Sequence, residues 1–146
     1  MFRKKEMESG LARIMRGKVR LRAVLKDLTA SLQRGTAFYR ISSRKADTDV
    51  EQYTPVDYRA ERDRKKLEQF VITNSALKDG HFKKRIECLS KAVPRSENLF
   101  EENATQLIYG DKIAFVDYNT ETAVIIENST IARFQTSIFR LLFKRL

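Results

Sequence analysis

Residues 109–128 read YGDKIAFVDYNTETAVIIEN, and this stretch decides the fold class. It contains two runs of β-branched, aromatic and other apolar residues, 112–118 and 122–128, joined by a polar Asn-Thr-Glu sequence. A third such run, 105–110, comes just before them and is followed by a Gly-Asp pair. Short polar loops with glycine or asparagine between runs of this kind are typical of β-hairpins. The sequence therefore predicts three consecutive strands joined by hairpin turns.

Helical patterns lie on both sides of these strands. In residues 18–35 apolar side chains recur at helical spacing, and Gly35 provides a stop. In residues 130–146, after a cap at Asn128 or Ser129, the apolar stripe is Ile131, Phe134, Ile138, Leu141 and Leu142, with Phe139, Phe143 and Leu146 beside it. A helix that is apolar over so much of its circumference should contact the sheet and something else. Phe139, Phe143 and Leu146 are the predicted dimer face.

The remaining segments complete an α/β pattern. A helix, a strand, a second helix and two more strands come before the hairpins, which predicts an α/β sandwich with a mixed sheet flanked by helices. Residues 1–17 are predicted to be a basic amino-terminal arm and 18–146 one domain. The other expected elements are a strand at 36–42, a polar loop at 43–52, a surface helix at 54–67 begun by Thr54 and Pro55, a strand at 68–73, a turn-rich connection at 74–84, a strand at 85–90 and a loop at 93–105.

Composition limits the classes of function. The chain has 146 residues, enough for one compact core, and a formal net charge of +10, which favours acidic partners. The single cysteine, Cys88, rules out an internal disulfide and fits a reducing compartment. The sequence has no signal-peptide pattern and no apolar run long enough to span a membrane, so a cytoplasmic protein that does not enter the membrane is expected.

The first hairpin contains the remainder of a catalytic spacing. Phosphodiesterases of one large superfamily use H-x-K-x-x-x-x-D, and here Gly110, Lys112 and Asp117 occupy those three positions. Glycine cannot attack phosphorus, so the nucleophile that this chemistry requires is missing. The odd spacing also places Lys112 and Asp117 on opposite faces of a strand unless a turn intervenes. The prediction is an ordinary hairpin with an exposed lysine and a turn aspartate, and no catalytic residue.

No other group in the sequence replaces the missing nucleophile. His81 is the only imidazole, and its own register places Cys88 where the acid belongs. One histidine and one cysteine cannot form a zinc cluster, and no Gly-rich phosphate loop occurs. We expect no metal site and no cofactor.

Basic residues concentrate near the amino terminus. The helix at 54–67 alternates arginine and lysine with acids, as a solvated helix with internal ion pairs does. The arm and the start of the first helix are basic enough to contact a polyanion such as nucleic acid. These candidate contacts are Arg3, Lys4, Lys5, Arg13, Arg16, Lys18, Arg20 and Arg22.

From about Lys18 to the end, the sequence resembles the carboxyl-terminal effector domain of TrmB-type transcription regulators. The matching stretches are LRAVLKDLTASLQRGTAFYRISS, YTPVDYRAERDRKKLEQFVIT, KKRIECLS and IYGDKIAFVDYNTETAVIIENSTIARFQTSIFRLLF. The last is the most specific, since that family typically ends in a strand pair, an IIE strand and a helix ending in Phe-x-x-x-aromatic. Phe139 and Phe143 keep this spacing, although tryptophan is common at the second position.

This resemblance implies a phospholipase D-like half-domain with a degenerate catalytic motif, in which Gly110, Lys112 and Asp117 are remnants. It implies a non-catalytic module that senses a small molecule or a partner and forms a homodimer or joins a DNA-binding domain. Regulators of this kind carry a winged helix before the effector domain, whereas only 1–17 precedes the match here. DNA binding is therefore not transferred, and the chain is expected to be a fragment, a stand-alone partner or a relative without its DNA-reading domain.

Two alternatives remain open at this point. The chain could be a small basic nucleic-acid-binding protein that uses its arm, or a phosphodiesterase of the phospholipase D superfamily that uses His81. A basic helix on a membrane surface, from FRLLFKRL, is weaker because its apolar residues are needed in the fold.

Overall fold

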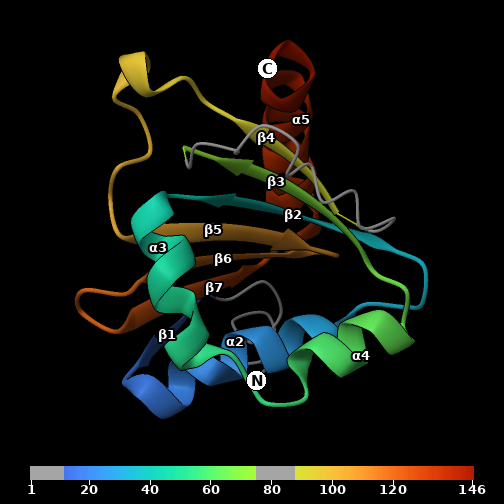
Figure 1. The fold of residues 1–146 in the computed structure, drawn as a ribbon. Helices are drawn as coiled ribbons and strands as arrows, with labels where there is room; N and C mark the ends of the chain where they lie inside the picture. Colours follow the sequence, from blue (N-terminus) through green and yellow to red (C-terminus); the bar gives the residue numbers. More distant parts are fainter. Residues whose placement is uncertain (1–11, 75–87) are drawn as a thin grey trace, which may run out of the picture.

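The structure, a computed structural model, describes residues 12–74 and 88–146 (Figure 1). Seven strands in this part of the chain form one sheet in the order β1-β7-β6-β5-β2-β3-β4. Strands β2, β3 and β4 are parallel, and all other neighbours are antiparallel, so the predicted mixed sheet is confirmed. The strands are β1 (Ala12–Arg16), β2 (Ala37–Ser42), β3 (Glu68–Thr73), β4 (Cys88–Ala92), β5 (Ala104–Tyr109), β6 (Lys112–Asp117) and β7 (Thr122–Glu127).

The three carboxyl-terminal strands form the predicted pair of hairpins. In the first, Tyr109 pairs with Lys112, so Gly110 and Asp111 alone make the turn. Gly110 has a φ of 57°, a left-handed conformation that glycine adopts without steric cost. In the second hairpin, Asp117 pairs with Thr122, and Glu121 has a φ of 50°.

Helices cover both faces of the sheet, as predicted (Figure 1). One group of helices packs on the face of the first core and a long helix packs on the other face. The first group is α2 (Lys18–Ser31), α3 (Arg44–Asp49), the 3₁₀ helix η1 (Val50–Tyr53) and α4 (Tyr58–Arg64); the opposite helix is α5 (Ser129–Arg145). Within the described residues, no helix has the length and apolar content needed to cross a membrane.

The sheet separates two hydrophobic cores. Leu107 and Tyr109 of β5 point into the core beneath α2, whereas Ile108 between them points into the core beneath α5. This alternation follows from the pleat of the strand. The α2 side of the first core is formed by Leu21, Val24, Leu25, Leu28 and Leu32.

The predicted polar loop at 43–52 is wrong, because these residues form α3 and η1. The side chain of Ser43 caps α3 by accepting a hydrogen bond of 2.9 Å from the backbone N–H of Ala46. Ala46 is completely buried. A capped turn anchored by one alanine gives almost no periodic signal, so the polar composition misled the prediction.

The predicted helix at 54–67 is real but shorter, and it begins at Tyr58 rather than at Pro55. Thr54 does not cap it; its backbone is extended, because a residue before proline avoids the helical region. The Thr54 hydroxyl instead donates to the carbonyl of Val50, at 2.8 Å, and so closes η1.

The predicted arm at 1–17 is wrong over residues 12–16, which form the edge strand β1. Ala12 to Arg16 pair antiparallel with β7, from Ile126 back to Thr122. Without β1, the outer edge of β7 would present unpaired backbone groups. Residues 1–11 of the arm, most of the connection at 74–84 and the first three residues of the strand predicted at 85–90 lie outside the described residues, and His81 is among them. The predicted loop at 93–105 contains a short 3₁₀ helix, η2 (Arg95–Glu97), and ends where β5 begins.

Candidate functional site

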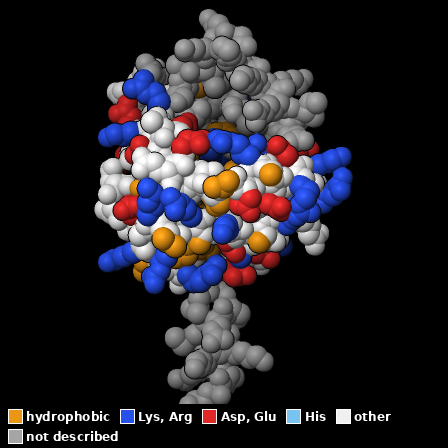
Figure 2. Space-filling model, turned by 60° about the horizontal axis from the view of Figure 1, so that its bottom comes forward, with side chains coloured by type: hydrophobic (Ala, Val, Ile, Leu, Met, Phe, Trp, Pro, Cys, Tyr) orange, Lys and Arg blue, Asp and Glu red, His pale blue; other side chains and the backbone are white. Residues whose placement is uncertain are grey.

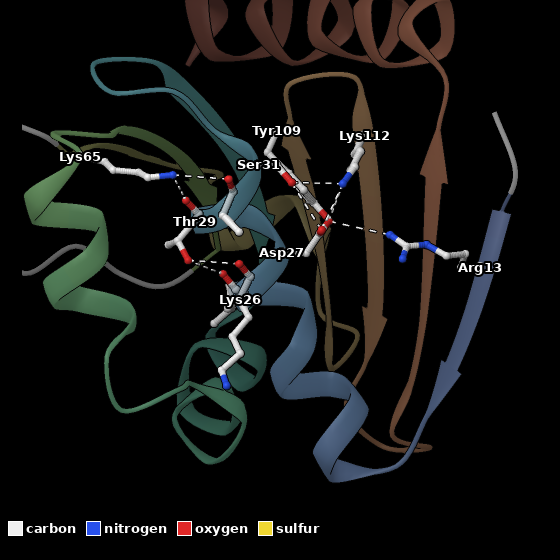
Figure 3. A network of polar contacts seen from close by, with 10 residues as sticks. Arg13, Lys26, Asp27, Thr29, Ser31, Lys65, Tyr109 and Lys112 are labelled. Atoms are coloured by element: carbon white, nitrogen blue, oxygen red, sulfur yellow. Dashed lines mark hydrogen bonds and ion pairs between the residues drawn. The ribbon is translucent and has the colours of Figure 1, made fainter. Parts of the chain in front are cut away.

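Lys112 begins β6, and its ammonium group is fully engaged with helix α2 (Figure 3). Its Nζ lies 3.0 and 3.1 Å from the two carboxylate oxygens of Asp27 and 3.1 Å from the hydroxyl of Ser31. The Lys112 side chain is only 15% exposed and that of Asp27 27%. Lys112 is thus not the exposed lysine that the sequence suggested, and its charge is compensated in the fold.

Tyr109 and Arg13 complete this group, which we call the Asp27 cluster: Arg13, Asp27, Ser31, Tyr109 and Lys112. The Tyr109 hydroxyl donates to Asp27 Oδ2 at 2.9 Å, and Arg13 Nη2 lies 3.9 Å from the same oxygen. Burial raises the pKa of Tyr109 well above its ordinary value, and the charge and hydrogen bond of Asp27 raise it further. The cluster therefore connects α2, the β5–β6 hairpin and β1 through one carboxylate.

Asp117 lies at the other end of β6 and on the opposite face, as the odd spacing predicts. It accepts hydrogen bonds from the backbone N–H of Asn119, at 2.9 Å, and from the hydroxyl of Thr120, at 2.7 Å. The Thr120 hydrogen bond lowers the pKa of Asp117 below its ordinary value. These are the contacts of a turn aspartate. Lys112 and Asp117 are not brought together.

Gly110 occupies the first position of the two-residue turn. A Cβ atom there would meet only Leu32 Cδ2, at 3.9 Å, so space alone does not require glycine. The φ of 57° does favour it, because L-residues with a side chain rarely adopt this conformation. The glycine at position 110, where the H-x-K-x-x-x-x-D spacing has histidine, is therefore explained by the geometry of the turn.

The predicted dimer face is wrong, because Phe139, Phe143 and Leu146 pack into the second core. Phe139 is 1% exposed, and its ring centroid lies 5.1 Å from that of Tyr39. Phe143 packs edge-on against Phe70, at 5.7 Å. The exposed apolar residues of the helix are Ile131, Phe134, Ile138 and Leu141, which we call the α5 stripe.

The predicted polyanion contacts near the amino terminus are exposed where the structure describes them. Those that the structure describes are Arg13, Arg16, Lys18, Arg20 and Arg22, on β1 and α2. Figure 2 shows the face of α2 and α4, where lysine and arginine side chains are spread among acidic and apolar ones. Arg3, Lys4 and Lys5 lie outside the described residues.

A cavity of about 280 Å³ lies between the sheet and the helices α2, η1 and α4. Arg40, in the middle of β2, is one of the charged residues that line this cavity, with Asp47, Glu51, Arg59, Arg62 and Asp63, and we call it the Arg40 cavity. The sequence prediction missed it, because no single segment contains its lining. The signal that was present is an arginine inside a strand of aromatic and apolar residues. The lining includes Leu21, Val24, Leu25, Arg40, Asp47, Tyr53, Tyr58, Arg62, Gln69, Leu107 and Tyr118.

No group of three or more histidine, cysteine, aspartate or glutamate side chains that could bind a metal occurs in the part of the chain that the structure describes. Two polar arrangements lie on the face of the sheet that α2 covers, the Asp27 cluster and the Arg40 cavity. In the Asp27 cluster the charges of Asp27 and Lys112 compensate each other, whereas the Arg40 cavity encloses open space.

Comparison with known proteins places the fold but not a family. No protein-family model matches the chain, and no curated protein matches it. Among solved structures, TrmBL2, described as an archaeal chromatin protein with a novel mode of DNA binding, is similar with a TM-score of 0.59 and 10% sequence identity. The two chains share a fold. The match covers 99% of this chain and 60% of TrmBL2, so this chain spans less than two thirds of the TrmBL2 chain.

Proposed function

We propose that this chain is a non-catalytic effector and dimerisation domain of a transcription regulator, with a phospholipase D-like ancestry. The match to TrmBL2 over nearly the whole chain supports a TrmB-related origin. The separation of Lys112 from Asp117, and the turn glycine at position 110, support the loss of phosphodiesterase chemistry. A ligand or partner would act by favouring one arrangement of the domain, by no more than its differential affinity for the two arrangements.

The α5 stripe is the observation that supports dimerisation. Its four residues are between 45% and 69% exposed. They recur at i, i+3, i+7 and i+10, the spacing at which two helices pack along a common seam. A contiguous apolar helix face on a domain surface is typical of a protein–protein contact. A second copy of this chain would cover both stripes at once, because a two-fold contact is self-complementary.

Solution mass measured by light scattering tests this directly. The wild-type chain is expected to be a dimer, and Phe134→Glu with Ile138→Glu is expected to be a monomer. Arg133→Glu is the matched control, since it places one glutamate on an exposed part of α5 away from the stripe. A monomeric wild type, or a double variant that stays dimeric, would refute the proposed contact.

The absence of catalysis has its own test. Gly110→His restores the missing imidazole, and histidine tolerates a left-handed backbone better than most residues. We expect no hydrolysis of bis(p-nitrophenyl) phosphate, because Asp27 engages Lys112 and Asp117 lies on the other face of β6. Turnover by the wild-type chain that disappears in His81→Ala would overturn the non-catalytic assignment.

Nucleic-acid binding is the second candidate, and one arrangement favours it. Arg16, at the end of β1, and Lys18, Arg20 and Arg22, in the first turns of α2, are all exposed. If they contact phosphates, duplex DNA affinity should fall steeply between low and moderate salt, by about one unit of log–log slope for each contact. Arg20→Gln with Arg22→Gln should reduce that slope, and a salt-independent interaction would exclude this candidate.

A further inference from the structure

Arg40 has hydrogen-bonding capacity that the fold does not use. It lines the cavity together with residues of α2, α3 and α4, and these helices lie on the same side of the sheet (Figure 1). Among the described residues, its buried Nε has no hydrogen-bond partner. Its nearest carboxylate is Asp47, with Nη2 and Oδ1 3.8 Å apart, too far for a hydrogen bond. A planar guanidinium left in this way is suited to a bidentate anion.

The carboxylates around the cavity are already engaged by other groups. Asp47 accepts the hydroxyl of Ser42 at 2.6 Å on one oxygen and that of Thr73 at 3.0 Å on the other. Glu51 pairs with Arg59, and Asp63 pairs with Arg62. Their hydrogen-bonding capacity is therefore directed away from Arg40, although their charges still face the cavity.

The positive charge of Arg40 extends over the tyrosines of the cavity. Burial raises the pKa of Tyr58 and of Tyr118, and the Arg40 charge acts in the opposite direction on both. Arg62 lies with its guanidinium carbon 5.7 Å from the ring centroid of Tyr58, and its Nη2 pairs with Oδ1 of Asp63 at 3.5 Å; its side chain is 16% exposed. Gln69, which is 6% exposed, adds an amide to the sheet side of the lining.

The apolar part of the lining comes from Leu21, Val24 and Leu25 of α2 and from Leu107 and Val116 of the sheet. We infer that the Arg40 cavity binds a small organic anion, a carboxylate or a phosphate ester attached to an apolar ring or chain. The charged group lies against Arg40, and the apolar part lies beneath α2. This inference names the ligand class for the proposed sensing role and rests on that role for its biological meaning.

Binding can be measured on the whole chain by amide chemical shifts in a titration. The probes are benzoate and phenyl phosphate, with benzamide as the neutral analogue and inorganic phosphate as the anion without an apolar part. At least one of the two organic anions should bind at roughly tenfold higher affinity than benzamide and inorganic phosphate, which corresponds to ~1.4 kcal/mol. The preferred anion distinguishes a carboxylate from a phosphate ester.

Variants locate the site. Arg40→Gln should weaken binding of the preferred anion at least about tenfold, and Arg40→Lys should restore part of it, because lysine supplies charge but not the planar fork. Arg133→Gln, an exposed arginine on the opposite helix, is the control and should bind like the wild type. If Arg40→Gln does not fold, Gln69→Leu tests whether the anion binds in this cavity. The comparison of the anion with its neutral analogue in the wild type still tests whether binding requires the negative charge.

Equal binding of benzamide and benzoate, unchanged binding in Arg40→Gln, or no binding by either organic anion would overturn the inference. The dimer test depends on the α5 stripe and the binding test on Arg40, on opposite faces of the sheet. Either proposal can therefore fail while the other stands.

Discussion

Asp27 accepts hydrogen bonds from Tyr109 and Lys112 and lies 3.9 Å from Arg13. Three elements therefore depend on one carboxylate. Such a partly buried ion pair contributes little net stability compared with apolar residues of the same shape, but removing one partner is costly. At the residue scale, Lys112 therefore has a structural role, since it ties the β5–β6 hairpin to α2.

Lys112→Met should lower the free energy of unfolding by ~1–3 kcal/mol, because Asp27 would lose its closest cation in a site of limited exposure. Urea denaturation measures this. Lys26→Met is the matched control, because Lys26 is exposed on the same helix and its side chain points away from the cluster in Figure 3. Equal losses in the two variants would show that the Asp27 contact contributes nothing specific.

Tyr109 should make stability sensitive to alkaline pH. Its pKa in the folded chain is raised above the ordinary 10.0. Above that pH the unfolded chain loses the proton while the folded chain retains it, so unfolding becomes more favourable as pH rises. Wild-type stability should fall more steeply than that of Tyr109→Phe, by up to ~1.4 kcal/mol per pH unit. Urea denaturation from about pH 8 to about pH 11 tests this; parallel curves would contradict it.

At the scale of elements, one helix end is capped by a side chain next to it in the sequence, and another by a side chain far from it in the sequence. Asn128 caps α5 locally, accepting from the backbone N–H of Ile131 at 3.0 Å. The last carbonyls of α2 are instead satisfied by Lys65, whose Nζ lies 2.9 Å from the carbonyl oxygen of Leu32 and also contacts that of Thr29. The first cap is visible in the sequence, and the second requires the tertiary fold.

Asn128→Ala should destabilise the chain by ~1 kcal/mol, since the N–H of Ile131 loses its acceptor. Asn128→Asp should keep most of the stability, because the carboxylate also accepts at a helix amino terminus. Thermal unfolding followed by circular dichroism compares the two. An alanine variant as stable as the aspartate variant would mean that the cap is not needed.

The same contrast explains what could be predicted from the sequence. The β5–β6–β7 hairpins and α5 were predicted correctly because their turns, caps and periodicity are local. Helix α3 was not predicted because it depends on one buried alanine, Ala46, and strand β1 was not predicted because it depends on the open edge of β7. The Asp27 cluster was missed for the same reason, since Asp27 and Lys112 are far apart in the chain. For α5, the prediction assigned the wrong side of the helix to the core. Both sides are apolar, so the sequence alone does not say which one packs against the sheet.

At the scale of the whole molecule, the sheet keeps the two candidate surfaces apart. The Arg40 cavity belongs to the face of α2, and the α5 stripe belongs to the other. Arg40 and Tyr39 are nevertheless neighbours on β2, and Tyr39 packs against Phe139 of α5. Strand β2 therefore lines the Arg40 cavity and contacts the buried side of α5 through adjacent residues.

Dimerisation through the α5 stripe predicts stability that depends on protein concentration. Because association stabilises only the folded state, the thermal midpoint of the wild type should rise by several degrees over a roughly hundredfold concentration range. Phe134→Glu with Ile138→Glu should show a constant midpoint. Scanning calorimetry at several concentrations makes the comparison, and a constant midpoint for the wild type would argue against the dimer.

The pairing of β1 with β7 has a consequence for biosynthesis. β1 is among the first parts of this domain to leave the ribosome, but its hydrogen-bonding partner is among the last. The sheet therefore cannot close at this edge until almost the entire domain has been translated. Until then, the backbone of residues 12–16 is available to any nascent-chain chaperone that recognises an extended, basic peptide.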